Sequence, residues 1–379
     1  MTDLEERIMN KASKYILPAL LAVIVLVLLV FVCIYFTRFR TMATIEQLTD
    51  YDDGYNLYRM DVKYDYSIDK IINYGIMDDQ TMLEAILKET LPLLPISMKA
   101  PSFGCSAFTL TDTGGDVHMG RNYDFKNDTS AMLVCCTPKD GYKSVAFAAL
   151  DNVSANVPDA NLGKKFASLT APFVCLDGLN EKGVSIAVLT LDSEPTRQHT
   201  GKPTIATTLA IRLVLDRAAT TEEAVELLSG YDMYATSGRD YHFYITDASG
   251  DGRVFEYDCN SEGRELVVTP SEAVTNFFVM YRNEVLPNQK NGIYGHGRER
   301  YDAIMEILDA QRGAHTNDTA WEAIRAAAQD PNPEDITSNT QWSIVYNNTD
   351  LTAEIAIRRH WDDITYYTME DGAVTTTAK

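Results

Sequence analysis

The residue in this sequence with the most evident chemistry is Cys105, which directly follows Gly104. A free thiol has a pKa of about 8.5 and is a weak nucleophile until it loses its proton. If Cys105 were the first residue of a mature chain, its α-amine, with a pKa of about 7.7–8.0, could accept that proton without a histidine. A Gly-Cys pair alone is also typical of a buried structural cysteine, so the prediction depends on the residues around it.

Two charged residues follow Cys105 within one short segment. Arg121 comes sixteen residues later and Asp124 nineteen residues later, in the sequence Gly120-Arg121-Asn122-Tyr123-Asp124. A guanidinium beside a thiol favours the thiolate, and a carboxylate can hold a terminal amine. The same two side chains could instead form a structural ion pair beside a turn.

This spacing resembles the choloylglycine hydrolase superfamily, which includes bile salt hydrolases, penicillin V acylases, acid ceramidase, N-acylethanolamine acid amidase and isopenicillin N acyltransferase. Its members have Arg sixteen and Asp nineteen residues after the nucleophilic Cys, within a Gly-Arg-Asn-x-Asp motif. The resemblance covers about residues 100–361, in which further segments follow in the family order. These segments are Asp177-Gly178-Leu179-Asn180-Glu181-Lys182-Gly183, the predicted hairpin 242–257, Val274-Thr275-Asn276, Gly297-Arg298-Glu299-Arg300-Tyr301 and Trp342-Ser343-Ile344-Val345-Tyr346.

The resemblance implies a cysteine N-terminal-nucleophile (Ntn) hydrolase whose catalytic residues are Cys105, Arg121, Asp124, Asn180, Asn276 and Arg300. The amide N–H of Asn180 and the side chain of Asn276 would bind the oxyanion, where loss of one donor costs about 3–4 kcal/mol. Asn180 could equally be a turn residue, and Asn276 a buried amide that satisfies strand ends. Arg298 is the alternative to Arg300.

The implied activity is hydrolysis of a linear carbon–nitrogen amide bond in an N-acyl compound, through an acyl-thioester on Cys105. Bile salt hydrolases expose their cysteine by losing only the initiator Met, whereas 104 residues precede it here, as in acid ceramidase and the acyltransferase. Self-cleavage after Gly104 is therefore expected, because a residue without Cβ tolerates the strained geometry of the attack. The alternatives are an acyltransferase of the isopenicillin N type and a catalytically silent, membrane-tethered binding protein.

We expect neither a metal nor another cofactor. The six histidines are scattered without metal-ligand spacing, and no CxxC pair suggests zinc. Asp247 and Asp251 fit a hairpin turn better than a calcium loop. The segment Gly295-His296-Gly297 is only a fragment of a phosphate loop.

The N-terminus contains a candidate membrane anchor. No residue from Tyr15 to Phe36 is charged, a length that suffices for a span of about 20 residues. A cleaved signal peptide is the alternative, with Thr41-Met42-Ala43 as its cleavage site. The basic residues before the span, Arg7, Lys11 and Lys14, favour a single-pass protein whose catalytic domain is extracytoplasmic.

We predict five parts: a short flank (1–14), a transmembrane anchor (15–36), a pro-segment (37–104), an Ntn hydrolase domain (105–361) and a tail (362–379). Alternating runs at 107–111, 184–189 and 241–245 predict antiparallel strands. Helices are expected from 82 to 91, from 205 to 218, after Thr220, around 301–308 and from 320 to 329. Strands in blocks with helices between them predict an α+β fold. The resemblance refines this to four αββα layers.

The net charge of −21 lies almost wholly in the body of the chain, because residues 1–14 are balanced and residues 37–40 are basic. Such an acidic surface repels phosphate backbones, so we expect no nucleic-acid partner. The expected partners are a small N-acyl amide substrate and the membrane, contacted through residues 15–36.

Overall fold

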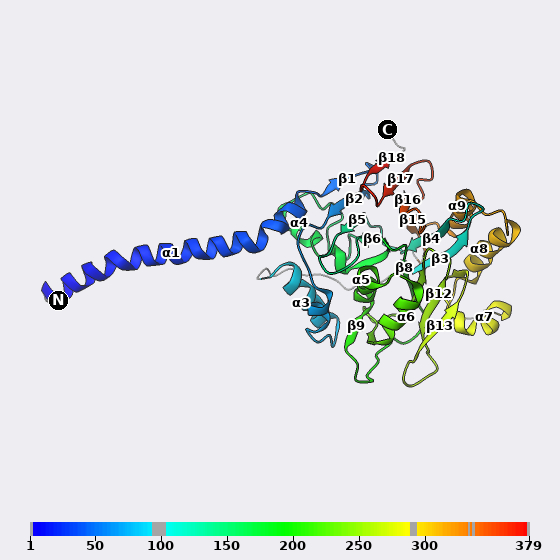
Figure 1. The fold of residues 1–379 in the computed structure, drawn as a ribbon, viewed down its shortest axis with the longest axis horizontal. Helices are drawn as coiled ribbons and strands as arrows, with labels where there is room; N and C mark the ends of the chain where they lie inside the picture. Colours follow the sequence, from blue (N-terminus) through cyan, green and yellow to red (C-terminus); the bar gives the residue numbers. More distant parts are fainter. Residues whose placement is uncertain (1–2, 93–103, 289–293, 333, 336–337, 377–379) are drawn as a thin grey trace.

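A computed structural model describes residues 3–92, 104–288, 294–332, 334–335 and 338–376. The last part of the predicted pro-segment, residues 93–103, therefore lies outside the described residues. A long N-terminal helix projects from a body of two stacked sheets (Figure 1).

The first large sheet has nine strands in the order β1-β2-β5-β6-β7-β8-β11-β12-β13, and the second has seven in the order β14-β3-β4-β15-β16-β17-β18. Strands β9 and β10 form a separate parallel pair. The strands are β1 (Glu46–Gln47), β2 (Leu57–Asp61), β3 (Gly104–Thr111), β4 (Val117–Asp124), β5 (Ala131–Cys136), β6 (Ser144–Ala149), β7 (Cys175–Asn180), β8 (Ser185–Leu191), β9 (Thr204–Ala206), β10 (Asp232–Tyr234), β11 (Asp240–Thr246), β12 (Arg253–Tyr257), β13 (Leu266–Pro270), β14 (Ala273–Val274), β15 (Thr340–Asn347), β16 (Thr352–Ile357), β17 (Ile364–Thr368) and β18 (Val374–Thr376).

Helices cover the outer face of each sheet. Helices α5 and α6 pack on the nine-stranded sheet, and α8 and α9 pack on the seven-stranded sheet. Every residue of β4, β8 and β11 is buried, as expected for strands covered on both faces. The predicted α+β fold with four αββα layers is confirmed. The helices are α1 (Asp3–Met42), α2 (Ile68–Ile72), α3 (Asp79–Thr90), α4 (Leu162–Ser168), α5 (Thr207–Arg217), α6 (Thr221–Ser229), α7 (Arg282–Asn288), α8 (Arg298–Ala310) and α9 (Asn317–Ala327), with short 3₁₀ turns at Ala171–Phe173 and Val279–Tyr281.

The predicted helices are all present, with small shifts at their ends. Thr220 caps α6 as expected, since its side chain accepts the backbone N–H of Glu223 at 3.1 Å. Helix α9 begins at Asn317, three residues before the predicted start, because Thr316 and Thr319 form a capping box.

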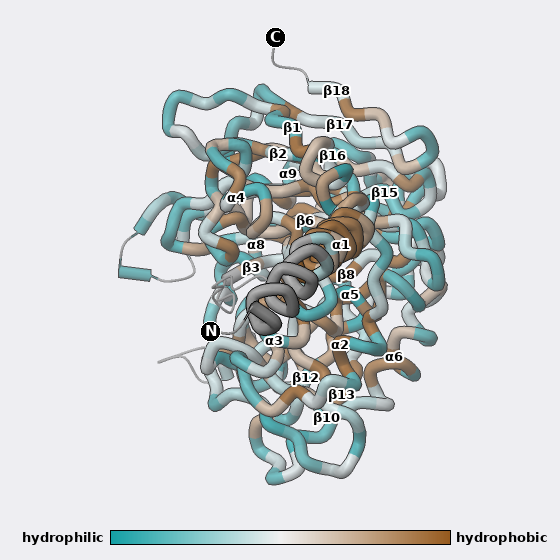
Figure 2. Tube along the Cα trace, turned by 90° about the vertical axis from the view of Figure 1, so that its left-hand side faces the viewer, coloured by the Kyte–Doolittle hydropathy of each residue, from teal (hydrophilic) through white to brown (hydrophobic). Residues whose placement is uncertain are grey.

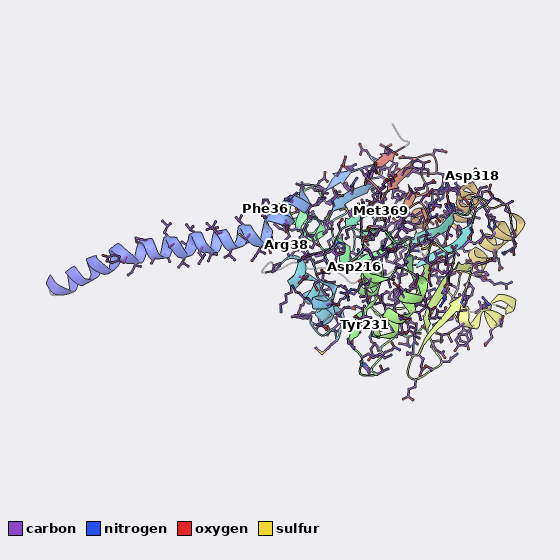
Figure 3. All side chains as sticks on the ribbon, viewed as in Figure 1. Phe36, Arg38, Asp216, Tyr231, Asp318 and Met369 are labelled. Atoms are coloured by element: carbon purple, nitrogen blue, oxygen red, sulfur yellow. The ribbon has the colours of Figure 1, made fainter. Side chains whose placement is uncertain are left out.

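Helix α1 contains the apolar segment. Residues Pro18–Met42 are long and apolar enough to cross a membrane, a property that anchors and signal sequences share. The coloured part of this helix is strongly hydrophobic (Figure 2). Its last turns enter the body, near the labelled Phe36 and Arg38 (Figure 3).

The sheets include strands from outside the predicted hydrolase domain. Strand β2 pairs in parallel with β5, so part of the predicted pro-segment belongs to the nine-stranded sheet. Strands β17 and β18, from the predicted tail, extend the seven-stranded sheet. The five-part division itself stays a prediction.

Candidate active site

Two adjacent strands place Cys105 between the sheets. In the antiparallel pairing of β3 with β4, Cys105 lies opposite Tyr123 and Gly104 lies opposite Asp124. Side chains alternate along a strand, so Cys105 and Arg121 share the face toward the nine-stranded sheet, while Asp124 points to the other face. The thiol is fully buried.

The surroundings of the thiol act on its charge in opposite directions. Burial raises the pKa of Cys105 to about 12, because the thiolate loses its hydration. The guanidinium of Arg121 lowers this pKa, the charge of Asp124 raises it, and a hydrogen bond from the backbone N–H of Asp124 lowers it. In the uncleaved chain burial dominates, and the sulfur is a neutral thiol.

Arg121 is held by the facing sheet. Its Nε donates to Asp177 Oδ2 at 3.3 Å and its Nη2 donates to the carbonyl of Val188 at 3.1 Å. Asp177 also accepts from Tyr346 Oη at 2.6 Å and from Trp342 Nε1 at 3.1 Å. Burial raises the pKa of Asp177, and these donors favour its ionised form. A fixed positive charge therefore lies beside the thiol.

Asn276 connects Cys105 to strand β8. Its Oδ1 accepts the backbone N–H of Cys105 at 3.3 Å and Nη2 of Arg300 at 2.7 Å. Its Nδ2 donates to the carbonyl of Thr190 at 2.9 Å. These partners fix which end of the amide is oxygen. One N–H of the Nδ2 group stays available for a developing oxyanion, because an amide nitrogen has two donors.

Arg300 contacts three of the predicted site residues. Its Nη1 donates to the carbonyl of Cys105 at 2.8 Å and lies 3.5 Å from Asp124 Oδ2. Its side chain is 5% exposed, whereas that of Arg298 is 37% exposed and pairs with Asp302. The structure therefore places Arg300, and not Arg298, in the cluster.

Asp124 is enclosed by polar donors from the C-terminal part of the chain. Thr340 Oγ1 donates to Oδ1 at 2.6 Å and Gln329 Nε2 donates to Oδ2 at 3.1 Å. Burial raises the pKa of Asp124, and Arg300 opposes this rise by its charge. Neither Thr340 nor Gln329 was expected from the sequence, because both lie more than 200 residues after Asp124.

Asn180 does not join this cluster, which corrects the expected oxyanion role. Its backbone N–H donates to the carbonyl of Val184 at 2.9 Å. Its Nδ2 donates to Leu215 and Ala218 carbonyls at 3.1 and 2.8 Å, and its Oδ1 accepts from the Lys182 N–H. All its donors hold the β7–β8 turn against α5, so the alternative reading as a turn residue is the one that the geometry favours.

A loop that looked unimportant in the sequence positions both Asn276 and Arg300. The backbone N–H of His296 donates to the carbonyl of Asn276 at 2.9 Å. Gly297 has a φ of +85°, and a Cβ there would lie 2.5 Å from Nη2 of Arg300. A Cβ at Gly295, where φ is +111°, would lie 2.1 Å from the carbonyl oxygen of Asn276. The Gly295-x-Gly297 spacing shortly before Arg300 was the signal in the sequence that could have identified this loop.

A buried histidine supports the same strand end. His242 Nε2 lies 2.9 Å from the carbonyl of Thr275, and its Nδ1 lies 2.9 Å from Glu256 Oε1. Glu256 also accepts the N–H groups of Val279 and Met280, at 2.6 and 2.8 Å. This network fixes the backbone next to Asn276.

Among the described residues, one group has the spacing of metal ligands: Asp112, Asp116 and His118. It lies at the β3–β4 turn, at the opposite end of β3 from Cys105. Asp112 Oδ1 accepts the N–H groups of Gly114 and Asp116, at 2.8 and 3.0 Å. Ordinary turn geometry accounts for this group.

Comparison with known proteins agrees with this arrangement. Residues 105–268 match the family described as linear amide C–N hydrolases, choloylglycine hydrolase family. Penicillin V acylase from Agrobacterium tumefaciens has a similar fold, with a TM-score of 0.52 and 19% identity over 72% of this chain and 90% of its own. A variant of conjugated bile acid hydrolase from Clostridium perfringens has a TM-score of 0.53 and 14% identity, over 72% of this chain and 96% of its own. No curated protein sequence matches the chain significantly.

The family match begins at Cys105, and the structural alignments cover 90% and 96% of the two relatives, so the likeness in fold extends over most of their length. Residues 105–268, which include Cys105, Arg121 and Asp124, are similar to the choloylglycine hydrolase family of linear amide C–N hydrolases.

Proposed function

We propose that this protein cleaves itself between Gly104 and Cys105 and then uses Cys105 to hydrolyse an N-acyl amide through an acyl-thioester. The observation that carries the proposal is the pair of side-chain contacts to the backbone of Cys105. Its N–H and its carbonyl are both bound by buried side chains, those of Asn276 and Arg300. Such contacts would hold a new N-terminus in place after the peptide bond is cut.

In the cleavage step the thiol of Cys105 would attack the carbonyl carbon of Gly104. A C–S bond forms, the C–N bond breaks, and the proton passes to the freed amine. Water then hydrolyses the thioester, which leaves a free thiol and an α-amine on Cys105. Gly104 lacks a Cβ, which lowers the steric cost of this attack.

In the hydrolytic step the α-amine would take the thiol proton, and the thiolate would attack the substrate carbonyl. Arg121 would favour the thiolate. Asp124, whose carboxylate lies 3.5 Å from Arg300, would hold the amine. The second N–H of Asn276 Nδ2 would donate to the oxyanion. The leaving amine takes the proton, and water releases the acyl group.

We further propose that α1 is a permanent anchor with the body outside the cytoplasmic membrane. The end of α1 is built into the body: Tyr35 is fully buried, and Arg38 donates to the carbonyls of Thr90 and Glu89 at 2.5 and 2.8 Å. Cleavage as a signal peptide after Ala43 would remove these contacts, which supports the anchor.

Intact-mass and N-terminal sequencing of the purified protein test the proposal. We expect a C-terminal fragment that begins at Cys105, together with hydrolysis of acyl amides that survives a chelator and is lost after alkylation. Cys105→Ala should remain whole, and Cys105→Ser should be cut slowly, because a hydroxyl is the weaker nucleophile. Uncut yet active protein would refute the α-amine mechanism, and activity that requires zinc would refute the thiol chemistry.

A further inference from the structure

A polar pocket opens one residue beyond the cluster. Thr190, whose carbonyl binds Asn276, is followed by Leu191 and Asp192, which line a pocket of about 730 Å³. The opposite side of the pocket comes from the segment before β11, which includes Arg239. Asp192 also lies 2.6 Å from His296 Nδ1, and the N–H of His296 binds Asn276. Two paths therefore connect the pocket to the site: the backbone from Asp192 to Thr190, and the contact between Asp192 and His296.

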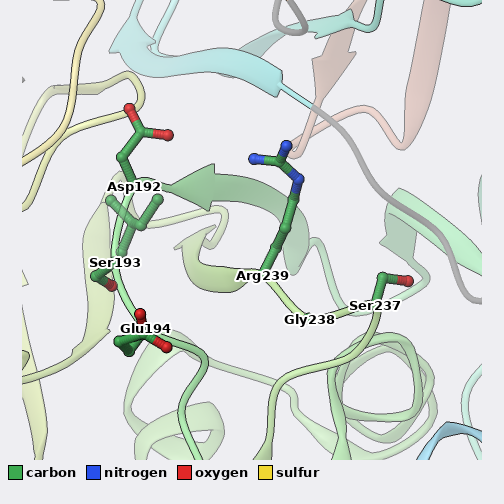
Figure 4. A pocket seen from close by; sticks show the side chains of 7 residues that line it. Asp192, Ser193, Glu194, Ser237, Gly238 and Arg239 are labelled. Carbon is green, nitrogen blue, oxygen red and sulfur yellow. The ribbon is translucent and has the colours of Figure 1, made fainter.

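Both signs of charge surround this pocket. Asp192 and Glu194 come from the loop after β8, and Arg239 extends from the other loop (Figure 4). The pKa of Asp192 is lowered by its hydrogen bond with His296 and also by the charge of Arg239. Asp192 is therefore a carboxylate at neutral pH.

Arg239 is the unusual member of this set. Within the described part of the chain, its guanidinium has no hydrogen-bond or salt-bridge partner among the protein side chains, although it is only partly exposed. By contrast, the guanidinium of Arg121 binds Asp177 and that of Arg300 binds Asn276. An unpaired guanidinium at the wall of a pocket is well suited to bind a carboxylate in bidentate fashion.

We infer that the substrate is a zwitterionic N-acyl amide, whose carboxylate binds Arg239 and whose ammonium group binds Asp192 and Glu194. This inference rests on the proposed function, since it places the substrate beside Cys105. The lining contains one apolar side chain, Leu191, in the described pocket wall, so a long alkyl chain finds little surface to bury there.

Four matched probes test the two charges separately. Nα-benzoyl-lysine carries both charges, benzoyl-norleucine only the carboxylate, benzoyl-lysinamide only the ammonium group, and benzoyl-norleucinamide neither. The set is made in two versions. One version carries the charged groups on the amine side of the scissile bond, and the other carries them on the acyl side. N-palmitoyl ethanolamine is the long-chain comparison, and the enzyme is the full chain in detergent.

Wild-type enzyme should have its highest kcat/KM on the zwitterion of one set. Arg239→Met should raise KM about tenfold or more for the probes with a carboxylate and leave the carboxamides unchanged, because a charge-assisted contact is lost. Glu194→Gln, which leaves the contact between Asp192 and His296 in place, should lower kcat/KM only for the probes with an ammonium group. Arg312→Met is the control, since it removes the same charge from an exposed arginine paired with Glu272 and Asp309.

Two kinds of failure are distinguishable. If wild type hydrolyses the probes through Cys105 and Arg239→Met changes all KM values alike, or if the palmitoyl amide is preferred, the pocket assignment is wrong. If Cys105→Ala retains the activity of wild type, the proposed function itself is wrong.

Discussion

The contact between Gly297 and Arg300 offers a sharp test of how the site is positioned. Gly297, the residue before α8, has a φ of +85°, and its missing Cβ leaves room for Nη2 of Arg300. In Gly297→Ala the new methyl group would lie 2.5 Å from Nη2, so the guanidinium must move away. That movement would lengthen the 2.7 Å bond to Asn276 and the 2.8 Å bond to the carbonyl of Cys105.

The control for backbone strain is Gly313→Ala, just beyond the other end of α8. Gly313 has a similar φ of +82°, and no heavy atom lies within 4 Å of a Cβ built there. Each substitution should lower the free energy of unfolding by about 1–2 kcal/mol, because a left-handed backbone is costly for alanine. Only Gly297→Ala also displaces Arg300.

The size of the expected loss in rate follows from the hydrogen bonds that Arg300 makes. A hydrogen bond with a charged partner contributes roughly 1.5–3 kcal/mol, and each 1.36 kcal/mol is about a tenfold change in rate. Loss of one such bond should slow self-cleavage and turnover about ten- to hundredfold in Gly297→Ala relative to Gly313→Ala. Thermal unfolding measures the strain, and time-resolved intact mass measures cleavage. Equal cleavage and equal turnover in the two variants would show that Arg300 does not act through these contacts.

Three further predictions concern the nucleophile, the oxyanion and the topology. Asn276→Ala should keep the fold, as judged by thermal unfolding, and lower kcat about a hundredfold or more, because its donor acts on charge that develops in the transition state; an unchanged kcat would remove Asn276 from the chemistry. In uncleaved chain, alkylation of Cys105 by iodoacetamide should be slow at neutral pH and keep rising toward pH 12, because burial raises the pKa of the thiol to about 12; a plateau near pH 8.5 would contradict this reasoning. Protease added to intact cells should remove the C-terminal domain, and full protection of that domain would reverse the topology.

The sequence predicted the local elements well where each depends on neighbouring residues. Alternation identified β8 and β11, and the spacing of Thr220 and Glu223 identified the start of α6. Strand β2 was not predicted, because its parallel pairing with β5 depends on residues more than 70 positions away. Periodicity within one segment contains no information on such a partner.

The site was predicted in part for the same reason. Cys105 and Arg121 were recognisable because adjacent strands keep their spacing fixed, and the structure brings Asn276 and Arg300 to them. Asn180 was misassigned, since an asparagine in a tight turn and one in an oxyanion hole both appear in the sequence as an amide near a glycine. Only the hydrogen-bond partners seen in the structure distinguish a turn asparagine from one in an oxyanion hole.

The strands and helix before Cys105 bear on what the proposed cleavage would do to the whole molecule. Strand β2 occupies the sheet next to β5, with Leu57, Tyr58 and Met60 buried, and each such side chain stabilises the folded state by about 1.5–3 kcal/mol. Arg38 ties the end of α1 to helix α3 through two backbone carbonyls. None of these contacts involves the bond between Gly104 and Cys105, so breaking that bond would leave them intact. With α1 as the proposed membrane anchor, the cut would therefore create an N-terminal nucleophile without releasing the domain, and the protein would act as two chains held by one sheet.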